Sequence, residues 1–199
     1  RENPEKIQNV SMWSVFSKNV KQRLHTMRAI GSHRSKTGMN RSMTSVATPF
    51  LNSFSEDFTL YARSGVLEPC IGREKEIQEV FEILSGGTRQ NVVLVGASGV
   101  GKRTIINGVA YLMISEEVPA FLQDKRLVNL SVAKLVSGVS ASEAEERILR
   151  IMDEIVKSQN IVLYIHDVSH LIGISSGNSG SIDLAGVLTE VLERKQVML

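Results

Sequence analysis

The stretch NVVLVGASGVGKRTIINGVA, from Asn91 to Ala110, constrains the fold more than any other part of the chain. Its apolar run Val92–Val95 is typical of a parallel strand that is buried on both faces. The segment Gly96–Lys102 then matches G-x-x-x-x-G-K, a loop whose N–H groups and lysine bind phosphate oxygens. Strand, spacing, lysine and following helix agree, which disfavours an ordinary glycine-rich turn. The stretch therefore predicts a nucleotide-binding α/β fold.

The loop has a composition that suits phosphate. Its glycines let the main chain turn tightly and approach an anion without a Cβ in the way. The following helix adds the positive end of its dipole. We expect ATP or ADP as the cofactor. The predicted nucleotide-binding residues of this stretch are Gly96, Ala97, Ser98, Gly99, Val100, Gly101, Lys102, Arg103 and Thr104.

The residue after the loop departs from the pattern. A serine or threonine is expected there, because its hydroxyl binds the magnesium ion of the nucleotide. Arg103 occupies the position instead. Thr104 comes next, but one helical step turns a side chain by about 100° and moves it about 1.5 Å along the axis. Thr104 is therefore expected to face away from the magnesium position.

Charge is distributed unevenly along the 199 residues. Residues 1–54 contain nine Lys and Arg against two acidic residues, and the rest contains 14 against 19. We interpret residues 1–48 as a basic linker or tail, mostly irregular with a possible helix from about Val10 to Ile30. Its few aromatic residues do not favour nucleic-acid binding. No apolar run predicts a membrane span, and a single cysteine suits a reducing compartment, either cytoplasm or an organelle interior.

Residues 49–199 are expected to form the nucleotide-binding domain, incomplete at its C-terminal end. Strands alternate with amphipathic helices, which predicts a parallel α/β sheet of the P-loop type with helices on its faces. Beyond the loop region, the expected helices are 56–64, 72–84, 142–157 and 182–194, the expected strands are 127–130, 161–165 and 197–199, and 171–183 is expected to be a loop.

A second candidate site follows the strand Ile161–Ile165. P-loop ATPases place an acidic magnesium ligand at such a strand end, usually with a glutamate after it that polarises water. His166 and Asp167 stand here instead. A neutral imidazole is a poor ligand for magnesium, which prefers oxygen. Asp167 lies one residue later and on the opposite face, so its candidate role is that of a shortened glutamate.

The chain from about Thr48 resembles the first ATPase domain of the Clp-type AAA+ unfoldases and disaggregases, the ClpA/ClpB/ClpC group. The resemblance is carried by LNSFSEDFTLYARSGVLEPCIGREKEIQEVFEILS, the loop stretch, VPAFLQDKRLVNLSVAKLVSG, EAEERILRIMDEI, NIVLYIHDVSHLIG and SIDLAGVLTEVL, in the order of the family. It implies a hexameric ring, of one or several kinds of subunit, that threads protein substrates and can serve a partner protease. It also implies that Ile71 and Gly72 contact the adenine.

The same resemblance defines three departures. Arg103 replaces the magnesium-binding threonine, and His166-Asp167 replaces an Asp-Glu pair. The family's substrate-gripping loop, Lys-Tyr-Arg-Gly, falls on Ser140–Ser142 with one residue deleted and no aromatic side chain.

Three interpretations follow. In the first, the domain binds nucleotide with little or no magnesium, because Arg103 and His166 neutralise phosphate charge; hydrolysis is impaired and the ring role is structural or regulatory. A variant of it is that the site has drifted and Arg103 is solvated. In the second, Lys102 and Asp167 suffice for an active ATPase motor. In the third, the domain is an interaction module that keeps only the fold.

Overall fold

The structure is a computed structural model that describes residues 47–86, 90–166, 168–171, 174–175, 181–182, 184–193 and 197–199. The predicted basic tail, apart from residues 47 and 48, lies outside the described residues, as does Asp167. Within the described part, no helix is long and apolar enough to cross a membrane.

A three-stranded sheet lies at the centre, in the order β1 (Ser55–Asp57), β2 (Arg126–Leu130) and β3 (Ile161–Tyr164). Strands β2 and β3 are parallel, with Arg126 opposite Ile161, whereas β1 pairs antiparallel with β2. On the other side of β3, Met198 forms a parallel bridge with Val162. A separate antiparallel pair joins β4 (Ile174–Ser175) to β5 (Ser181–Ile182). The predicted α/β sheet with parallel strands is confirmed, with an antiparallel strand at its edge.

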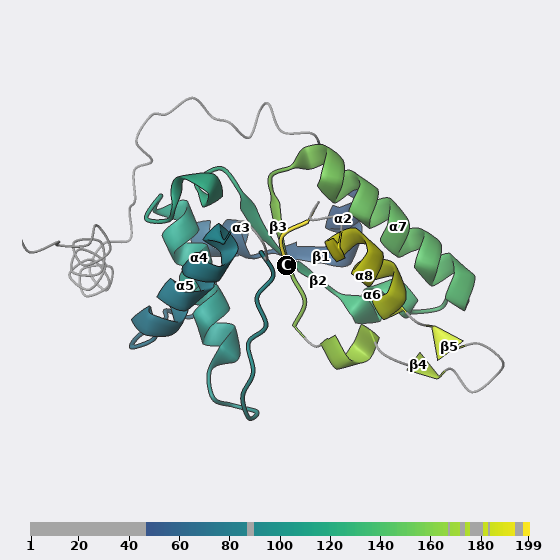
Figure 1. The fold of residues 1–199 in the computed structure, drawn as a ribbon, viewed down its shortest axis with the longest axis horizontal. Helices are drawn as coiled ribbons and strands as arrows, with labels where there is room; N and C mark the ends of the chain where they lie inside the picture. Colours follow the sequence, from purple (N-terminus) through teal and green to yellow (C-terminus); the bar gives the residue numbers. More distant parts are fainter. Residues whose placement is uncertain are drawn as a thin grey trace, which may run out of the picture. The chain divides into compact units, whose positions relative to one another are not determined.

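Helices cover both faces of the sheet (Figure 1). Alternate strand residues explain the two layers, because successive side chains point to opposite faces. Val128 and Leu163 belong to the core that also contains the buried face of α7, whereas Leu127 and Val162 are buried outside it. On the α7 side lie α2 (Pro49–Phe54), α6 (Val132–Val136), α7 (Ala141–Ser158) and α8 (Leu184–Glu193), and on the other side α3 (Phe58–Arg63), α4 (Glu74–Ser85) and α5 (Lys102–Ile114). Short 3-10 turns occupy Ala120–Leu122 and Val168–Leu171.

Helix α7 agrees with its predicted range to within one residue at each end. Its start is fixed by a capping box, in which the Ser140 hydroxyl accepts from the Glu143 N–H and the Glu143 carboxylate accepts from the Ser140 N–H. Its apolar stripe is buried against the sheet and includes Ile148, Ile151 and Ile155. Its outer face also fastens α2, because the Glu154 carboxylate accepts from two N–H groups in the first turn of that helix.

Three predictions of secondary structure are wrong, two of them in short segments. Residues 56–64 do not form one helix: β1 ends at Asp57, whose carboxylate accepts from the Leu60 N–H at 2.9 Å and caps α3. The loop predicted for 171–183 also contains the short strands β4 and β5.

The larger difference concerns Val92–Val95, which is irregular rather than a buried strand. Val93 and Val95 are 76% and 90% exposed. A strand requires a neighbour for its N–H and C=O groups. Val92 has one, since its N–H donates to the Leu199 carbonyl at 2.8 Å. No strand of the described chain pairs with residues 93–95, which form no regular structure and in which only Leu94 is half-buried.

Candidate nucleotide-binding site

The phosphate loop leads directly into α5. Gly99 and Gly101 have φ values of 80° and 97°, a backbone region that favours glycine. Gly101 is the N-cap residue, and α5 begins at Lys102. The first N–H groups of a helix have no acceptor within it and carry the positive end of its dipole. The loop residues Gly96–Val100 are exposed, so an anion can reach these donors.

Lys102 folds back over the loop. Its ammonium donates to the carbonyls of Gly96 and Ala97 at 2.8 and 2.9 Å. These bonds hold the cation beside the loop backbone, where a phosphate group would compete with the two carbonyls for it. The side chain is therefore in reach of the anion that the loop pattern predicts.

Arg103 extends away from the loop toward α3. Its guanidinium carbon lies 5.7 Å from the centre of the Phe58 ring, within the range of a cation–π contact. The Thr104 hydroxyl lies beside Gly101, since a Cβ built on Gly101 would be 3.7 Å from it. The side chain at the expected magnesium position is thus a cation that rests on an aromatic ring.

The end of β3 contributes to the same cluster. The Tyr164 ring meets the Phe58 ring edge-on at 5.7 Å, and its hydroxyl lies 2.8 Å from Nδ1 of His166. Burial raises the pKa of Tyr164, and the positive charge of Arg103 opposes this shift. Phe58, Tyr164, Arg103 and His166 therefore form one connected group, which we call the magnesium-position cluster. Asp167, the other residue predicted here, lies outside the described residues.

The magnesium-position cluster does not fit a magnesium ion. A guanidinium is a cation without a free lone pair, and magnesium prefers oxygen over imidazole nitrogen. Across the described ranges, no group of three or more His, Cys, Asp or Glu side chains could hold a metal. The phosphate loop, by contrast, fits a polyphosphate through its helix N-terminus, its two positive-φ glycines and Lys102.

The predicted base-side residues lie in a segment that is tied to α5. Gly72 has a φ of 75°, and the Ile71 side chain is 75% exposed, which leaves an apolar surface available to a ring. The Tyr111 hydroxyl donates to the Leu67 carbonyl at 2.5 Å, and the Arg73 guanidinium donates to the Val100 carbonyl at 2.7 Å. Sequence reasoning did not identify Tyr111 or Arg73 as site residues, because no sequence pattern links residues so far apart in the chain.

The segment predicted to correspond to the family's substrate-gripping loop is a short turn. Helix α6 ends at Val136 and α7 begins at Ala141, with Gly138 at a φ of 70° between them. Ser140 is committed to the cap of α7, and its hydroxyl lies 3.3 Å from that of Ser142. Ser140–Ser142 therefore belong to the start of a helix rather than to a projecting loop.

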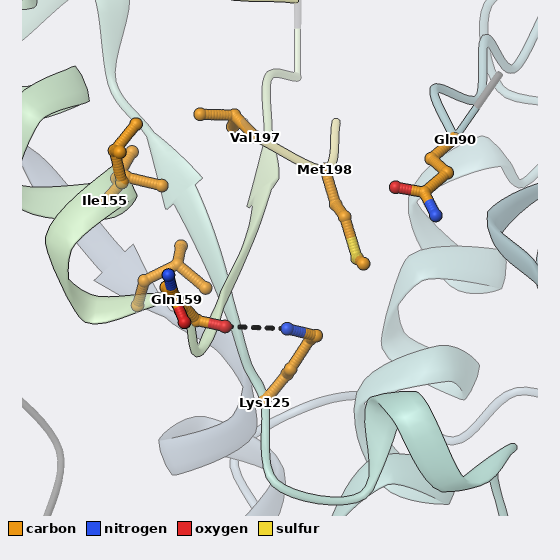
Figure 2. Close-up of a pocket in the computed structure, with 8 residues that line it drawn as sticks. Gln90, Lys125, Ile155, Gln159, Val197 and Met198 are labelled. Carbon is orange, nitrogen blue, oxygen red and sulfur yellow. Dashed lines mark hydrogen bonds between the residues drawn. The ribbon is translucent and has the colours of Figure 1, made fainter. Parts of the chain in front are cut away.

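A hollow lies at the opposite edge of the sheet (Figure 2). Lys125 and Gln159 precede β2 and β3, so they mark the amino ends of parallel strands, whereas ligands in such sheets bind at the carboxyl ends. The Lys125 ammonium donates to the Gln159 carbonyl at 2.7 Å, and burial lowers its pKa. The hollow is lined by Gln90, Lys125, Ile155, Val156, Gln159, Ile161, Val197 and Met198. It is thus separate from the phosphate loop.

Comparisons with known proteins agree with this geometry. The model of the ATPase family associated with various cellular activities (AAA) matches residues 92–198. The ATP-binding subunit ClpC of the ATP-dependent Clp protease from Staphylococcus aureus (strain USA300) is 37% identical over 179 residues, which are 89% of this chain and 22% of that protein. The negative regulator of genetic competence ClpC/MecB of Bacillus subtilis (strain 168) is 38% identical over 178 residues, with the same coverage.

Solved structures give a similar result. The S. cerevisiae Hsp104-ADP complex superposes with a TM-score of 0.64 at 36% identity, covering 73% of this chain and 25% of that chain. The closed state of Hsp104 with ATPγS and casein gives a TM-score of 0.66 at the same identity, covering 75% and 25%. The chain thus spans about a quarter or less of the length of these relatives. From its fold, its phosphate loop and these relatives, the chain belongs to the AAA family of ATPases, in its Clp-type group.

Proposed function

We propose that this domain binds ATP or ADP in the phosphate loop with little or no contribution from magnesium, and that it hydrolyses ATP slowly. The observation that carries the proposal is the magnesium-position cluster. Arg103 stands where a magnesium-binding hydroxyl is expected, and its guanidinium lies 5.7 Å from the centre of the Phe58 ring. His166, at the second position, has its Nδ1 engaged by Tyr164 at 2.8 Å.

Charge around the loop favours an anion without a metal. Lys102 and Arg103 lie in the first turn of α5, and among the described residues neither forms an ion pair with a carboxylate. Their charges add to that of the helix N-terminus, which attracts phosphate. Arg103 can also offer its planar fork to a phosphate group if it leaves Phe58.

Hydrolysis is expected to suffer more than binding. A metal ion stabilises the charge that develops on the transferred phosphoryl group by several kcal/mol. A loss of about 3–5 kcal/mol would slow the chemical step by roughly 10²–10⁴. We therefore propose that this domain has a structural or regulatory role in a ring, which is hexameric in the family, and that the turn at Ser140 does not grip protein substrates.

An active motor is the second candidate. In its favour, one relative is named as the ATP-binding subunit of an ATP-dependent protease, and one solved structure is bound to ATPγS. In that case Lys102 and Asp167 would support turnover. The binding and hydrolysis of ATP by the full-length protein, measured with magnesium and with a chelator, separate the two candidates. Magnesium-dependent turnover assigned to this domain would contradict our proposal.

Lys102→Ala tests the phosphate loop itself. The substitution removes the ammonium that reaches the loop carbonyls, and we expect nucleotide affinity to fall at least about 100-fold, or ~2.7 kcal/mol. Lys125→Ala is the matched control, because Lys125 lies at the opposite edge of the sheet and donates to Gln159. Calorimetric titration with ADP should detect the first loss and no change in the control. Equal affinities of wild type and Lys102→Ala would contradict the role of Lys102, whereas a wild-type protein that bound no ADP would support the interaction-module interpretation.

A further inference from the structure

One arginine, Arg73, joins the base-side segment, Leu67–Arg73, to the phosphate loop. Arg73 follows Ile71 and Gly72 and is the N-cap residue of α4. Its Nη1 lies 2.7 Å from the Glu76 carboxylate, and its Nη2 donates to the Val100 carbonyl at 2.7 Å, 27 positions along the chain. The guanidinium therefore bridges the start of one helix and the loop that starts another.

The contact with Val100 fixes the direction of a donor in the loop. In a trans peptide the carbonyl and the next N–H point to opposite sides, and the described residues contain no cis bond. Because Arg73 binds the Val100 carbonyl, the Gly101 N–H is turned away from Arg73. The guanidinium also packs on Gly101, since a Cβ there would lie 3.5 Å from Nη2. Arg73 thus limits how this half of the loop can rotate.

The other half of the loop is held differently. Lys102 binds the carbonyls of Gly96 and Ala97, and a phosphate group that recruits the ammonium must break these bonds. Arg73 differs from Lys102 in having a carboxylate as well as a carbonyl for a partner. Its Nη1 pairs with Glu76, whose pKa this pair lowers, while its Nη2 binds the Val100 carbonyl. The Arg73 contact is therefore able to persist when nucleotide binds.

The rest of the base-side segment is fastened to the shaft of α5. Tyr111 donates to the Leu67 carbonyl at 2.5 Å, and the buried Asn107 amide donates to the Glu68 carbonyl at 3.4 Å. Gly108 lets Cys70 approach closely, since a Cβ there would lie 2.9 Å from the Cys70 Cβ. The segment Leu67–Arg73 is thus attached to α5 along its length and to the loop at its end.

We infer that Arg73 is a positioning residue that sets the spacing between the base-side segment and the phosphate loop, so that one adenine nucleotide contacts both at once. The inference rests on the proposed nucleotide binding and deepens it. It assigns no contact between Arg73 and the nucleotide. A ligand with a base and phosphates should depend on Arg73 more than a ligand with phosphates alone.

The test compares ADP with inorganic pyrophosphate by calorimetric titration of the full-length protein. In Arg73→Gln, one charged hydrogen bond and the ion pair are lost, so ADP affinity is expected to fall roughly 10–100-fold. Pyrophosphate has no base to align, so its affinity should fall less, and the ratio of the two affinities should drop by about tenfold. Arg73→Lys keeps the charge without the planar fork, and it should restore part of the ratio.

Glu76→Gln is the matched control, because it removes the ion pair and leaves the bond to Val100. Its ratio of affinities should stay within about threefold of wild type. Thermal unfolding without ligand shows whether each variant is folded, and Arg73→Lys keeps the test available if Arg73→Gln is not. An equal loss for both ligands, or no loss, would overturn the inference while leaving the proposed function intact. Wild-type protein that bound neither ligand would contradict the proposed function and the inference together.

Discussion

Two of the helices that flank the sheet, α5 and α7, begin in different ways. Helix α7 starts at a capping box and rests on a continuous apolar core. Helix α5 starts at a glycine with a φ of 97°, after a loop whose side chains are exposed. The main contacts of that loop are polar and come from two cations, Lys102 and Arg73. The comparison indicates that hydrophobic burial holds α7 against the sheet, whereas polar bonds from Lys102 and Arg73 hold the phosphate loop at the start of α5.

The largest expected effect is a loss of stability in the core around α7, without a change in the phosphate loop. Ile151 is fully buried on α7, and Ile151→Ala should lower the free energy of unfolding by about 2–5 kcal/mol, through lost transfer energy and the cavity left behind. Chemical denaturation measures the change. Leu149→Ala is the control on the same helix, because Leu149 is 52% exposed, and it should cost no more than about 0.5 kcal/mol. A folded Ile151→Ala protein with weaker nucleotide affinity would show that the core around α7 and the phosphate loop are coupled, contrary to our comparison.

Gly108 lies on α5 where the base-side segment packs against it. Gly108→Ala would put a Cβ 2.6 Å from the Ile77 Cδ1 and 2.9 Å from the Cys70 Cβ. Alanine favours a helix over glycine by about 1 kcal/mol, but overpacking costs about 1–3 kcal/mol. We expect a net loss of stability together with weaker ADP binding, because the base-side segment is pushed from α5.

A second substitution identifies the cause of that loss. Ile77→Val removes the atom nearest to the new Cβ, so it should recover part of the stability of Gly108→Ala. Denaturation midpoints of the single and double variants measure this coupling. A Gly108→Ala protein that was more stable than wild type would mean that helix propensity outweighs the crowding.

The smallest effect should come from the start of α7. Ser140→Ala removes the hydroxyl of the capping box and should cost about 1 kcal/mol of unfolding free energy. Ser142→Ala leaves the box in place and serves as the control. Thermal unfolding can resolve the two, and neither variant should alter ADP affinity. A loss of affinity in Ser140→Ala would show that this turn communicates with the phosphate loop.

Periodicity and capping explain how much of the fold could be predicted. Helix α7 was predicted because its apolar residues recur at helical spacing, and strands β2 and β3 because they are short apolar runs, whereas α5 followed from the phosphate-loop motif. The strand at Val92–Val95 was not found in the structure, because apolar composition cannot supply the neighbouring strand that hydrogen bonding requires. Asp57 offered a missed signal, since an aspartate before an apolar run is a frequent helix cap.

The candidate site was predictable only where a motif is local. The loop Gly96–Lys102 is continuous in sequence, so its spacing predicted its place at the start of α5. The contacts of Arg103 with Phe58 and of Arg73 with Val100 join residues from separate elements. Such pairs depend on how α3 and α4 pack on α5, which composition and periodicity do not specify.

The central claim is that two substitutions have removed the magnesium requirement from a phosphate loop that still binds nucleotide. The most direct test is the ratio of ATP dissociation constants measured with a chelator and with magnesium, for the wild-type full-length protein and for the double variant Arg103→Thr, His166→Asp. We predict a ratio near one for the wild type and a rise of about tenfold, or ~1.4 kcal/mol, when both oxygen ligands are present. A wild-type protein that bound ATP at least about tenfold more tightly with magnesium would contradict the account.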